Sequence, residues 1–144
     1  MSISFKWPAG ISLGRSGTAL VLLGLATQAG AAPRLECRLE HGGTTYTVQA
    51  SAVTDPYTVA PQPVGDRFRF KAVMVGEGGR VDYVKLYAYY QGARQPVLLQ
   101  QAEYRAPAVT SGQDPVALTG KQRLYSPDLE RELSYGCALV EGNP

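Results

Sequence analysis

The sequence predicts an all-β fold, a single-domain antiparallel β-sandwich or small barrel of about seven strands in which one disulfide joins the first and last strands. Three observations support this prediction. Short runs rich in β-branched and aromatic residues alternate apolar with polar side chains. Clusters of glycine and proline separate these runs at short intervals. The two cysteines, Cys37 and Cys137, lie in the first and last runs.

Residues 1–31 have the pattern of a cleaved signal peptide. Lys6 and Arg15 provide a positive start without acids, residues 18–26 are apolar, and small residues close the segment. A retained membrane anchor is disfavoured because about nine apolar residues are far fewer than the roughly twenty that span a bilayer. We therefore expect residues 32–144 to form the β-domain of a periplasmic or secreted protein with no stable membrane insertion.

The charge of the mature chain indicates no general attraction to polyanions. The whole chain has 14 basic and 12 acidic side chains, but Lys6 and Arg15 belong to the signal segment. The remaining charges balance, so nucleic acid is not an expected partner. Removing 31 of the 144 residues leaves 113, the length of one domain. The excess of arginine over lysine is typical of a GC-rich bacterial genome.

Cys37 and Cys137 are predicted to form a disulfide because export takes the chain into an oxidising compartment. Both cysteines lie on the apolar face of their strands, so the bond belongs to the core. A redox or metal role is the alternative, but the sequence has no C-x-x-C motif that would favour it. Closing a loop of about 100 residues stabilises the fold by up to about 4.7 kcal/mol in the chain-entropy account.

Alternation and turn residues define the expected elements. Gly42-Gly43 between two alternating runs predicts the first hairpin. Three prolines make residues 54–66 a predicted loop that cannot join a central ladder. Residues 105–115 are a second loop, Gly120 is a candidate bulge, and residues 126–128 predict a turn. In chain order, the predicted strands are residues 34–40, 44–53, 67–75, 81–90, 96–104, 116–125 and 133–139.

The turn between the third and fourth strands decides which side chains share a face, because a one-residue shift exchanges the two faces. With a two-residue turn at Gly78-Gly79, Phe70 lies opposite Tyr87, and Tyr83, Tyr87 and Tyr89 point inward. With a three-residue turn that includes Glu77, Phe70 lies opposite Leu86 and the tyrosines point outward. Both arrangements are compatible with the sequence, and we prefer the second.

In the preferred arrangement, the outward tyrosines share a sheet face with Arg67 and Arg69. Arg–Tyr pairs across strands are favourable, and lysine can extend its charged end into water. A fault of this arrangement is that it places Lys71 opposite Lys85, because like charges across a ladder repel. The candidate binding face predicted in this way comprises Arg67, Arg69, Tyr83, Lys85, Tyr87 and Tyr89.

The sequence has no pattern that predicts catalysis. His41 is the single histidine and lies beside Gly42-Gly43, where a turn role is the common one. No serine lies in a nucleophile-elbow motif, and the acids are scattered over turns and outer faces. Metal-ligand spacing and phosphate-binding glycine loops are likewise absent from the sequence. We therefore predict no catalytic residue, no metal and no cofactor; a small hydrolase is the least favoured alternative.

Two functions remain open. The first is an exported, non-catalytic binding or accessory module whose sheet face contacts a protein or glycan of the cell envelope, since rigid aromatics and arginine suit such contacts. Ordinary packing across the strands is the competing explanation for these residues. The second function is enzyme inhibition through a loop.

A resemblance suggests the second function. Small all-β size, export and a disulfide between the terminal strands broadly resemble the membrane-bound and periplasmic inhibitors of C-type lysozyme. The resemblance covers only size, export and cysteine placement, and it implies a periplasmic inhibitor. The Ser-x-Ser-Gly-x-x-Tyr loop of those inhibitors is absent here: the nearest segment, Thr110-Ser111-Gly112-Gln113-Asp114, lacks the second serine and the tyrosine.

Overall fold

The computed structural model describes residues 31–110, 114–127 and 131–142. The predicted signal peptide lies almost wholly outside this part, so its cleavage stays a prediction. The described residues form eight strands and one short 3-10 turn. In chain order these are β1 (Arg34–His41), β2 (Thr44–Val53), η1 (Pro56–Thr58), β3 (Gln62–Val64), β4 (Phe68–Glu77), β5 (Arg80–Gln91), β6 (Pro96–Arg105), β7 (Gln122–Tyr125) and β8 (Glu132–Val140).

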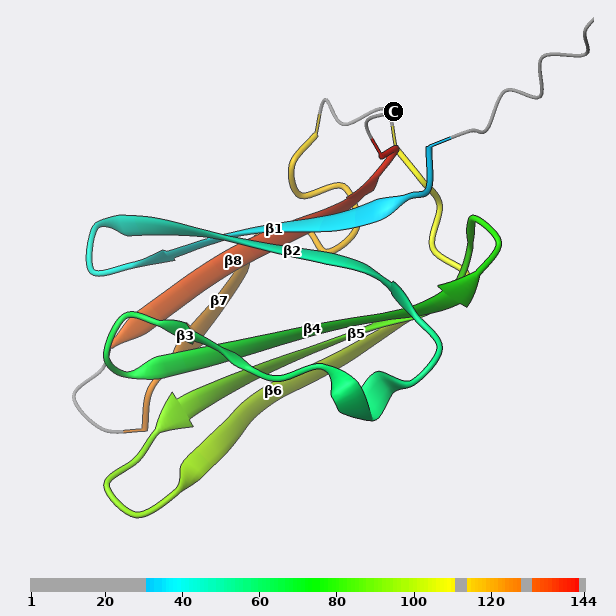
Figure 1. The fold of residues 1–144 in the computed structure, drawn as a ribbon. Coiled ribbons are helices and arrows are strands. Elements are labelled where there is room, and N and C mark those ends of the chain that lie inside the picture. Colours follow the sequence, from blue (N-terminus) through cyan, green and yellow to red (C-terminus); the bar gives the residue numbers. More distant parts are fainter. Residues whose placement is uncertain (1–30, 111–113, 128–130, 143–144) are drawn as a thin grey trace, which may run out of the picture.

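The strands form one sheet that curls into a nearly closed barrel (Figure 1). The order across the sheet is β6-β5-β4-β2-β1-β8-β7, and β3 pairs with the free part of the β4 edge. β2 and β4 run parallel, whereas the other strand pairs are antiparallel. The two outermost strands approach one another, because Gln100 on β6 bonds Gln122 on β7 at 3.5 Å. The predicted all-β architecture is therefore confirmed, in its barrel form.

The disulfide joins β1 to β8, as predicted. Cys37 and Cys137 lie directly opposite each other, with their Cα atoms 4.1 Å apart and both side chains buried. On the other edge of β8, the Cys137 amide donates to the Thr119 hydroxyl and its carbonyl accepts from Leu118. The residues before β7 therefore continue the pairing of β8. Gly136 is required here, because a Cβ atom would overlap the side chain of Val116.

The barrel interior is filled by side chains that alternate along the strands. Tyr135 reaches the junction of β6 and β7, where its hydroxyl donates to Gln100 Oε1 at 2.7 Å. Burial raises the pKa of this tyrosine well above its ordinary value. The largest fully buried side chains are Leu35, Leu39, Val64, Phe68, Phe70, Met74, Val84, Leu86, Leu133 and Leu139, with the disulfide among them.

The hairpin of β4 and β5 combines features of both predicted registers. The turn has two residues, because Glu77 pairs with Arg80 across Gly78-Gly79. Both glycines have positive φ, at 61° and 80°, as a two-residue hairpin turn requires. A bulge then leaves Asp82 without a partner on β4 and exchanges the faces of the strand beyond it. Tyr83, Tyr87 and Tyr89 therefore point outward as preferred, but the predicted three-residue turn is wrong.

The bulge also corrects the predicted pairs. Phe70 lies opposite Ala88 rather than Leu86. Lys71 lies opposite Tyr87, and Lys85 lies opposite Val73, so the two lysines do not face each other as the preferred register implied. The bulge thus removes the like-charge contact that was the fault of that register.

Two element predictions are wrong. Residues 54–66 contain β3, whose Val64 is fully buried. A strand here tolerates Pro63 because β3 pairs only with β4, and the missing N–H of a proline costs no hydrogen bond on the other, free edge.

The predicted strand at residues 116–125 is confined to β7. Gly120 is not a bulge but ends a tight turn, in which its amide donates to the Val116 carbonyl. The predicted turn at 126–128 is closed by Ser126 and Arg131, whose backbones bond at 2.8 Å, and its residue 128 lies outside the described part.

Candidate functional site

The candidate site is the outer face of the three-stranded region β4-β5-β6, which we call the tyrosine face. β5 is its central strand, paired to β4 on one side and to β6 on the other. Directly opposed residues in antiparallel strands point to the same side, so the register fixes which side chains meet. The charged and aromatic residues of the face are Arg69, Lys71, Tyr83, Lys85, Tyr87, Tyr89, Glu103 and Arg105. Val73, Val75 and Gln101 lie on the same side, opposite Lys85, Tyr83 and Tyr87.

Tyrosine side chains form a row along β5. The rings of Tyr87 and Tyr89 are nearly parallel, with an interplanar angle of 12° and centroids 6.3 Å apart. Tyr83 continues the row toward the β4–β5 turn. All three side chains are half-buried, and burial beside Tyr87 raises the pKa of Tyr89. Because their backbone is paired on both sides, these rings sit on a rigid support.

Lysines flank the aromatic row. The Lys71 Nζ atom lies over the ring of Tyr87, 5.8 Å from the centroid, and the Lys85 Nζ atom lies 5.1 Å from the centroid of Tyr83. Such cation–π contacts contribute roughly 0.5–1 kcal/mol at exposed sites. They orient the ammonium groups against the rings, so the cationic and aromatic parts of the face form one surface.

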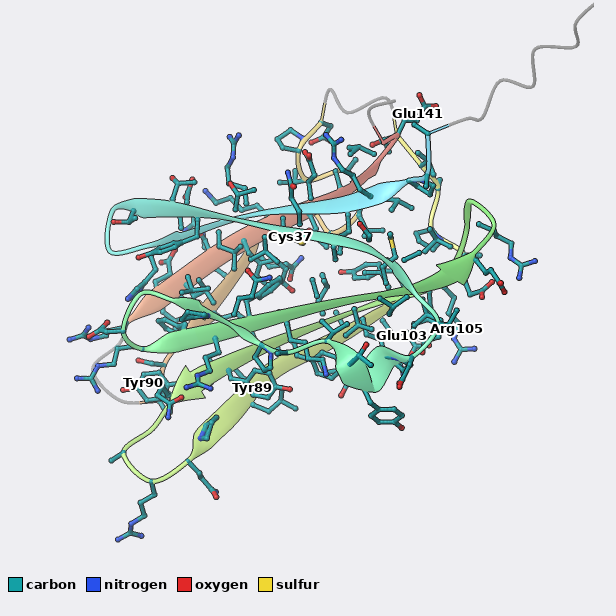
Figure 2. The ribbon with its side chains drawn as sticks, in the orientation of Figure 1. Cys37, Tyr89, Tyr90, Glu103, Arg105 and Glu141 are labelled. Atoms are coloured by element: carbon teal, nitrogen blue, oxygen red, sulfur yellow. A yellow bond between two sulfur atoms is a disulfide. The ribbon has the colours of Figure 1, made fainter. Side chains whose placement is uncertain are left out.

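Glu103 is the acid of the face and binds two cations. Its carboxylate lies 3.2 Å from Lys85 Nζ and 2.8 Å from Arg105 Nε. The hydrogen bond from Lys85, with the charge of Arg105 nearby, holds the pKa of Glu103 below its usual value. The same hydrogen bond and the Glu103 charge raise the pKa of Lys85. Glu103 and Arg105 come from β6 and lie together in Figure 2.

The structure brings five of the six predicted face residues together. Arg69 lies opposite Tyr89, and Tyr83, Lys85 and Tyr87 follow on the same side. Arg67 precedes β4, and its carbonyl accepts from the Gln91 amide, which continues the pairing of β4 with β5. Its side chain pairs with Asp66 at 3.4 Å, so Arg67 lies at the end of the tyrosine face with its charge compensated.

Three members of the face lie outside the predicted set. Lys71 points to the same side as Arg69 by the alternation of β4. Glu103 and Arg105 lie on β6, and their place depends on the register of β6 against β5. That register shifts between Ala88 and Tyr89, so the turn at residues 91–95 alone does not indicate which residues of β6 face the tyrosines.

The barrel end near the β1–β2 turn has a hollow of about 320 Å³, with Glu40, His41 and Ser134 on its wall. His41 Nδ1 donates to the Glu132 carbonyl at 2.9 Å, and its ring packs edge-on against Phe68. Ser134 donates to Glu40 at 3.3 Å, not to the histidine. The three side chains thus do not form a nucleophile–base relay in this structure.

The loop implied by the inhibitor resemblance is anchored at both ends. Thr110 donates from its amide and hydroxyl to the Leu139 carbonyl, at 2.7 and 3.1 Å. Asp114 accepts from the Val116 amide at 3.0 Å. The intervening residues 111–113 lie outside the described part. Among the described residues, no group of three or more His, Cys, Asp or Glu side chains is arranged to hold a metal ion.

Within the same described ranges, no helix has the length and apolar character that a membrane crossing would need. Comparison of the chain with protein-family models, with curated proteins and with solved structures found no match.

Proposed function

We propose that this protein is an exported, non-catalytic binding module whose ligand, a protein or glycan of the cell envelope, contacts the tyrosine face. The observation that carries the proposal is the combination of a row of half-exposed tyrosines with Arg69 and Lys71, which have no ion-pair partner among the described residues. Arginine and tyrosine are the residue types that contribute most to binding at protein surfaces.

The support beneath these side chains favours a binding role. Ligand binding is weakened when side chains or loops must become ordered, and a face built on a central strand avoids most of that loss. Tyr87 and Tyr89 already stack, and Lys71 already lies over Tyr87. The face is therefore preorganised for contact.

The compartment is part of the proposal. A buried disulfide between terminal strands is typical of an oxidising, extracellular environment. Together with the signal-peptide pattern in residues 1–31, it favours a periplasmic or secreted location in a bacterium. The envelope is then the source in which a ligand should be sought.

The test is retention of a ligand from an envelope extract by immobilised residues 32–144 with the disulfide formed. Wild type is compared with Arg69→Ala/Tyr87→Ala. The matched control is Arg123→Ala/Tyr125→Ala, which removes the same two residue types from exposed positions on β7. All three proteins are first compared by urea unfolding.

We expect wild type and the β7 control to retain the same ligand and the Arg69→Ala/Tyr87→Ala variant to lose it. Equal retention by all three proteins would place the contact elsewhere, and changes in residues 105–115 would then test the inhibitor alternative. If no protein retains a ligand, the tyrosine row serves packing across the strands, and the proposal is wrong.

A further inference from the structure

We propose that the ligand of the tyrosine face is an acidic polysaccharide, whose sugars contact the outward edges and hydroxyl groups of the tyrosines while its carboxylates bind Arg69 and Lys71. This inference rests on the proposed function and adds the chemical class of the ligand. It follows from the charge of the face, from the shape of the aromatic row and from the pairing of the strands beneath it.

The positive charge of the face is local. Four cations lie on it against one acid, and that acid, Glu103, already binds Lys85 and Arg105. Arg69 and Lys71 are left without an ion pair in the described part of the chain, on the β4 side of the tyrosine row. Since charges balance over residues 32–144, this surplus marks one surface rather than the whole molecule. A surface of this kind is complementary to an anion.

The tyrosine row has a shape that suits sugar rings. Pyranose rings carry hydroxyl groups at their edges, which hydrogen-bond to phenols. Their C–H groups can pack against the outward ring edges of the tyrosines, since the faces of Tyr87 and Tyr89 are turned toward each other. Tyr83 and Tyr89 are six residues apart on one strand, so the row extends over roughly 20 Å. A surface of this length favours an extended chain over a single sugar.

The strand pairing favours a polysaccharide over an acidic peptide. Extended peptides gain much of their affinity by adding a strand to an open sheet edge. The row lies on β5, whose backbone is already bonded to β4 and β6. A ligand on this face therefore contacts side chains alone, and sugar rings with carboxylates match the side chains present.

The experiment measures binding of disulfide-bonded residues 32–144 to three polymers by calorimetry. Polygalacturonate carries both sugar rings and carboxylates. Its fully methyl-esterified form keeps the sugar chain without the charge, and poly-glutamate keeps the charge without the sugar. We expect binding to polygalacturonate, weakened by added salt, and much weaker binding to the other two.

Three results would overturn the inference. Equal binding of the esterified polymer would remove the role of charge, and equal binding of poly-glutamate would remove the role of sugar rings. No binding of polygalacturonate would remove both. None of these results affects the proposed function, which fails only if envelope retention does not depend on Arg69 and Tyr87.

Variants locate the binding on the face. Arg69→Gln/Lys71→Gln should weaken polygalacturonate binding roughly tenfold, as expected for two lost charge-assisted contacts. The control Arg38→Gln/Lys121→Gln removes the same charges on the β1–β8 side of the barrel and should leave binding unchanged. If both variants lost affinity equally, binding would depend on overall positive charge rather than on the tyrosine face, and the proposed binding site would be wrong.

Glu103→Gln provides a gain of binding that a folding defect cannot mimic. The substitution removes the acid of the face and releases Lys85 and Arg105 from their ion pairs. It should therefore tighten polygalacturonate binding several-fold. Unchanged or weaker binding by a folded Glu103→Gln protein would contradict the proposed role of the face.

Discussion

At the residue scale, the acidic side chain of the tyrosine face forms ion pairs with two cations. Glu103 accepts from Lys85 and Arg105 and offsets one of these two positive charges. Arg69 and Lys71 lie on the other side of the tyrosines and remain uncompensated. The positive charge of the face is therefore greatest on the β4 side, where Arg69 and Lys71 have no acid beside them among the described residues, and we assign anion binding to that side.

The Lys85–Glu103 pair predicts a pH-dependent contribution to stability. The pKa of Glu103 is lowered from its usual 4.5 in the folded state, so the pair stabilises the fold above that value and loses its effect as the pH falls through the lowered pKa. The wild type should exceed Glu103→Gln in free energy of unfolding at neutral pH, and the difference should vanish in acid. The difference is small, because both side chains reach solvent.

Urea unfolding at the two pH values measures this difference. Glu77→Gln is the matched control, since that carboxylate has no ion pair among the described residues and none is lost. A difference between wild type and Glu103→Gln that persists in acid would show that the effect is not the ion pair.

At the element scale, a bulge determines what the barrel displays. The two-residue turn at Gly78-Gly79 alone would place the tyrosines of β5 on the core side. Asp82, close to this turn, has no partner on β4 and shifts the register by one residue. The residues of β5 beyond it therefore point to the opposite side of the sheet. Its carbonyl also accepts from the Ala106 amide at 2.8 Å, which fixes the end of β6.

Deletion of Asp82 should therefore be severely destabilising. Without Asp82, the buried side chains of β5, which include Val84 and Leu86, would point outward unless the turn changed its conformation. We expect the free energy of unfolding to fall by at least about 3 kcal/mol, the scale of a large core defect. Deletion of Ala93, in the exposed β5–β6 loop, is the control and should cost far less. Urea unfolding that is equal for the two deletions would contradict the role of the bulge.

At the element scale, the sequence predicts which residues of most strands point inward but not the bulge or the short strand β3. Alternation predicts the inward residues of β1, β4, β5 and β8, because one buried face imposes a period of two. It does not predict the bulge, since Asp82 differs in no local feature from a paired residue. It likewise misses β3, because Pro63 reads as a loop residue unless the free edge of its strand is known.

At the scale of the whole molecule, two different closures hold the barrel. The terminal strands β1 and β8 are neighbours, joined by backbone pairing and by the Cys37–Cys137 disulfide. The outermost strands β6 and β7 meet through side chains, with Gln100 between Tyr135 and Gln122. The disulfide therefore ties together two adjacent strands from opposite ends of the chain, whereas side chains link the two edges of the sheet.

Removing the disulfide should lower stability without changing the fold. The bond links residues 100 positions apart, and loss of such a long loop constraint destabilises by up to about 4.7 kcal/mol. Cys37→Ala/Cys137→Ala should show a lower free energy of unfolding in urea, and wild type under reducing conditions should approach the same value. If the variant is as stable as the oxidised wild type, the disulfide does not support the barrel.

The candidate site was predictable only in part for a reason that belongs to the whole molecule. Residues on one strand, such as Tyr87 and Tyr89, share a face by alternation. Residues from different strands share a face only through the strand order, which the sequence does not state. Glu103 and Arg105 join the tyrosines because β6 pairs with β5.

The central claim is that a ligand covers the tyrosine face, and tyrosine nitration followed by mass spectrometry tests it directly. Residues 32–144 would be nitrated with and without an envelope extract. Tyr57 and Tyr125, at 91% and 57% exposed, provide internal controls outside the face. The account predicts that the extract protects Tyr83, Tyr87 and Tyr89 and leaves both controls reactive. Protection of the controls alone, or of no tyrosine, would contradict it.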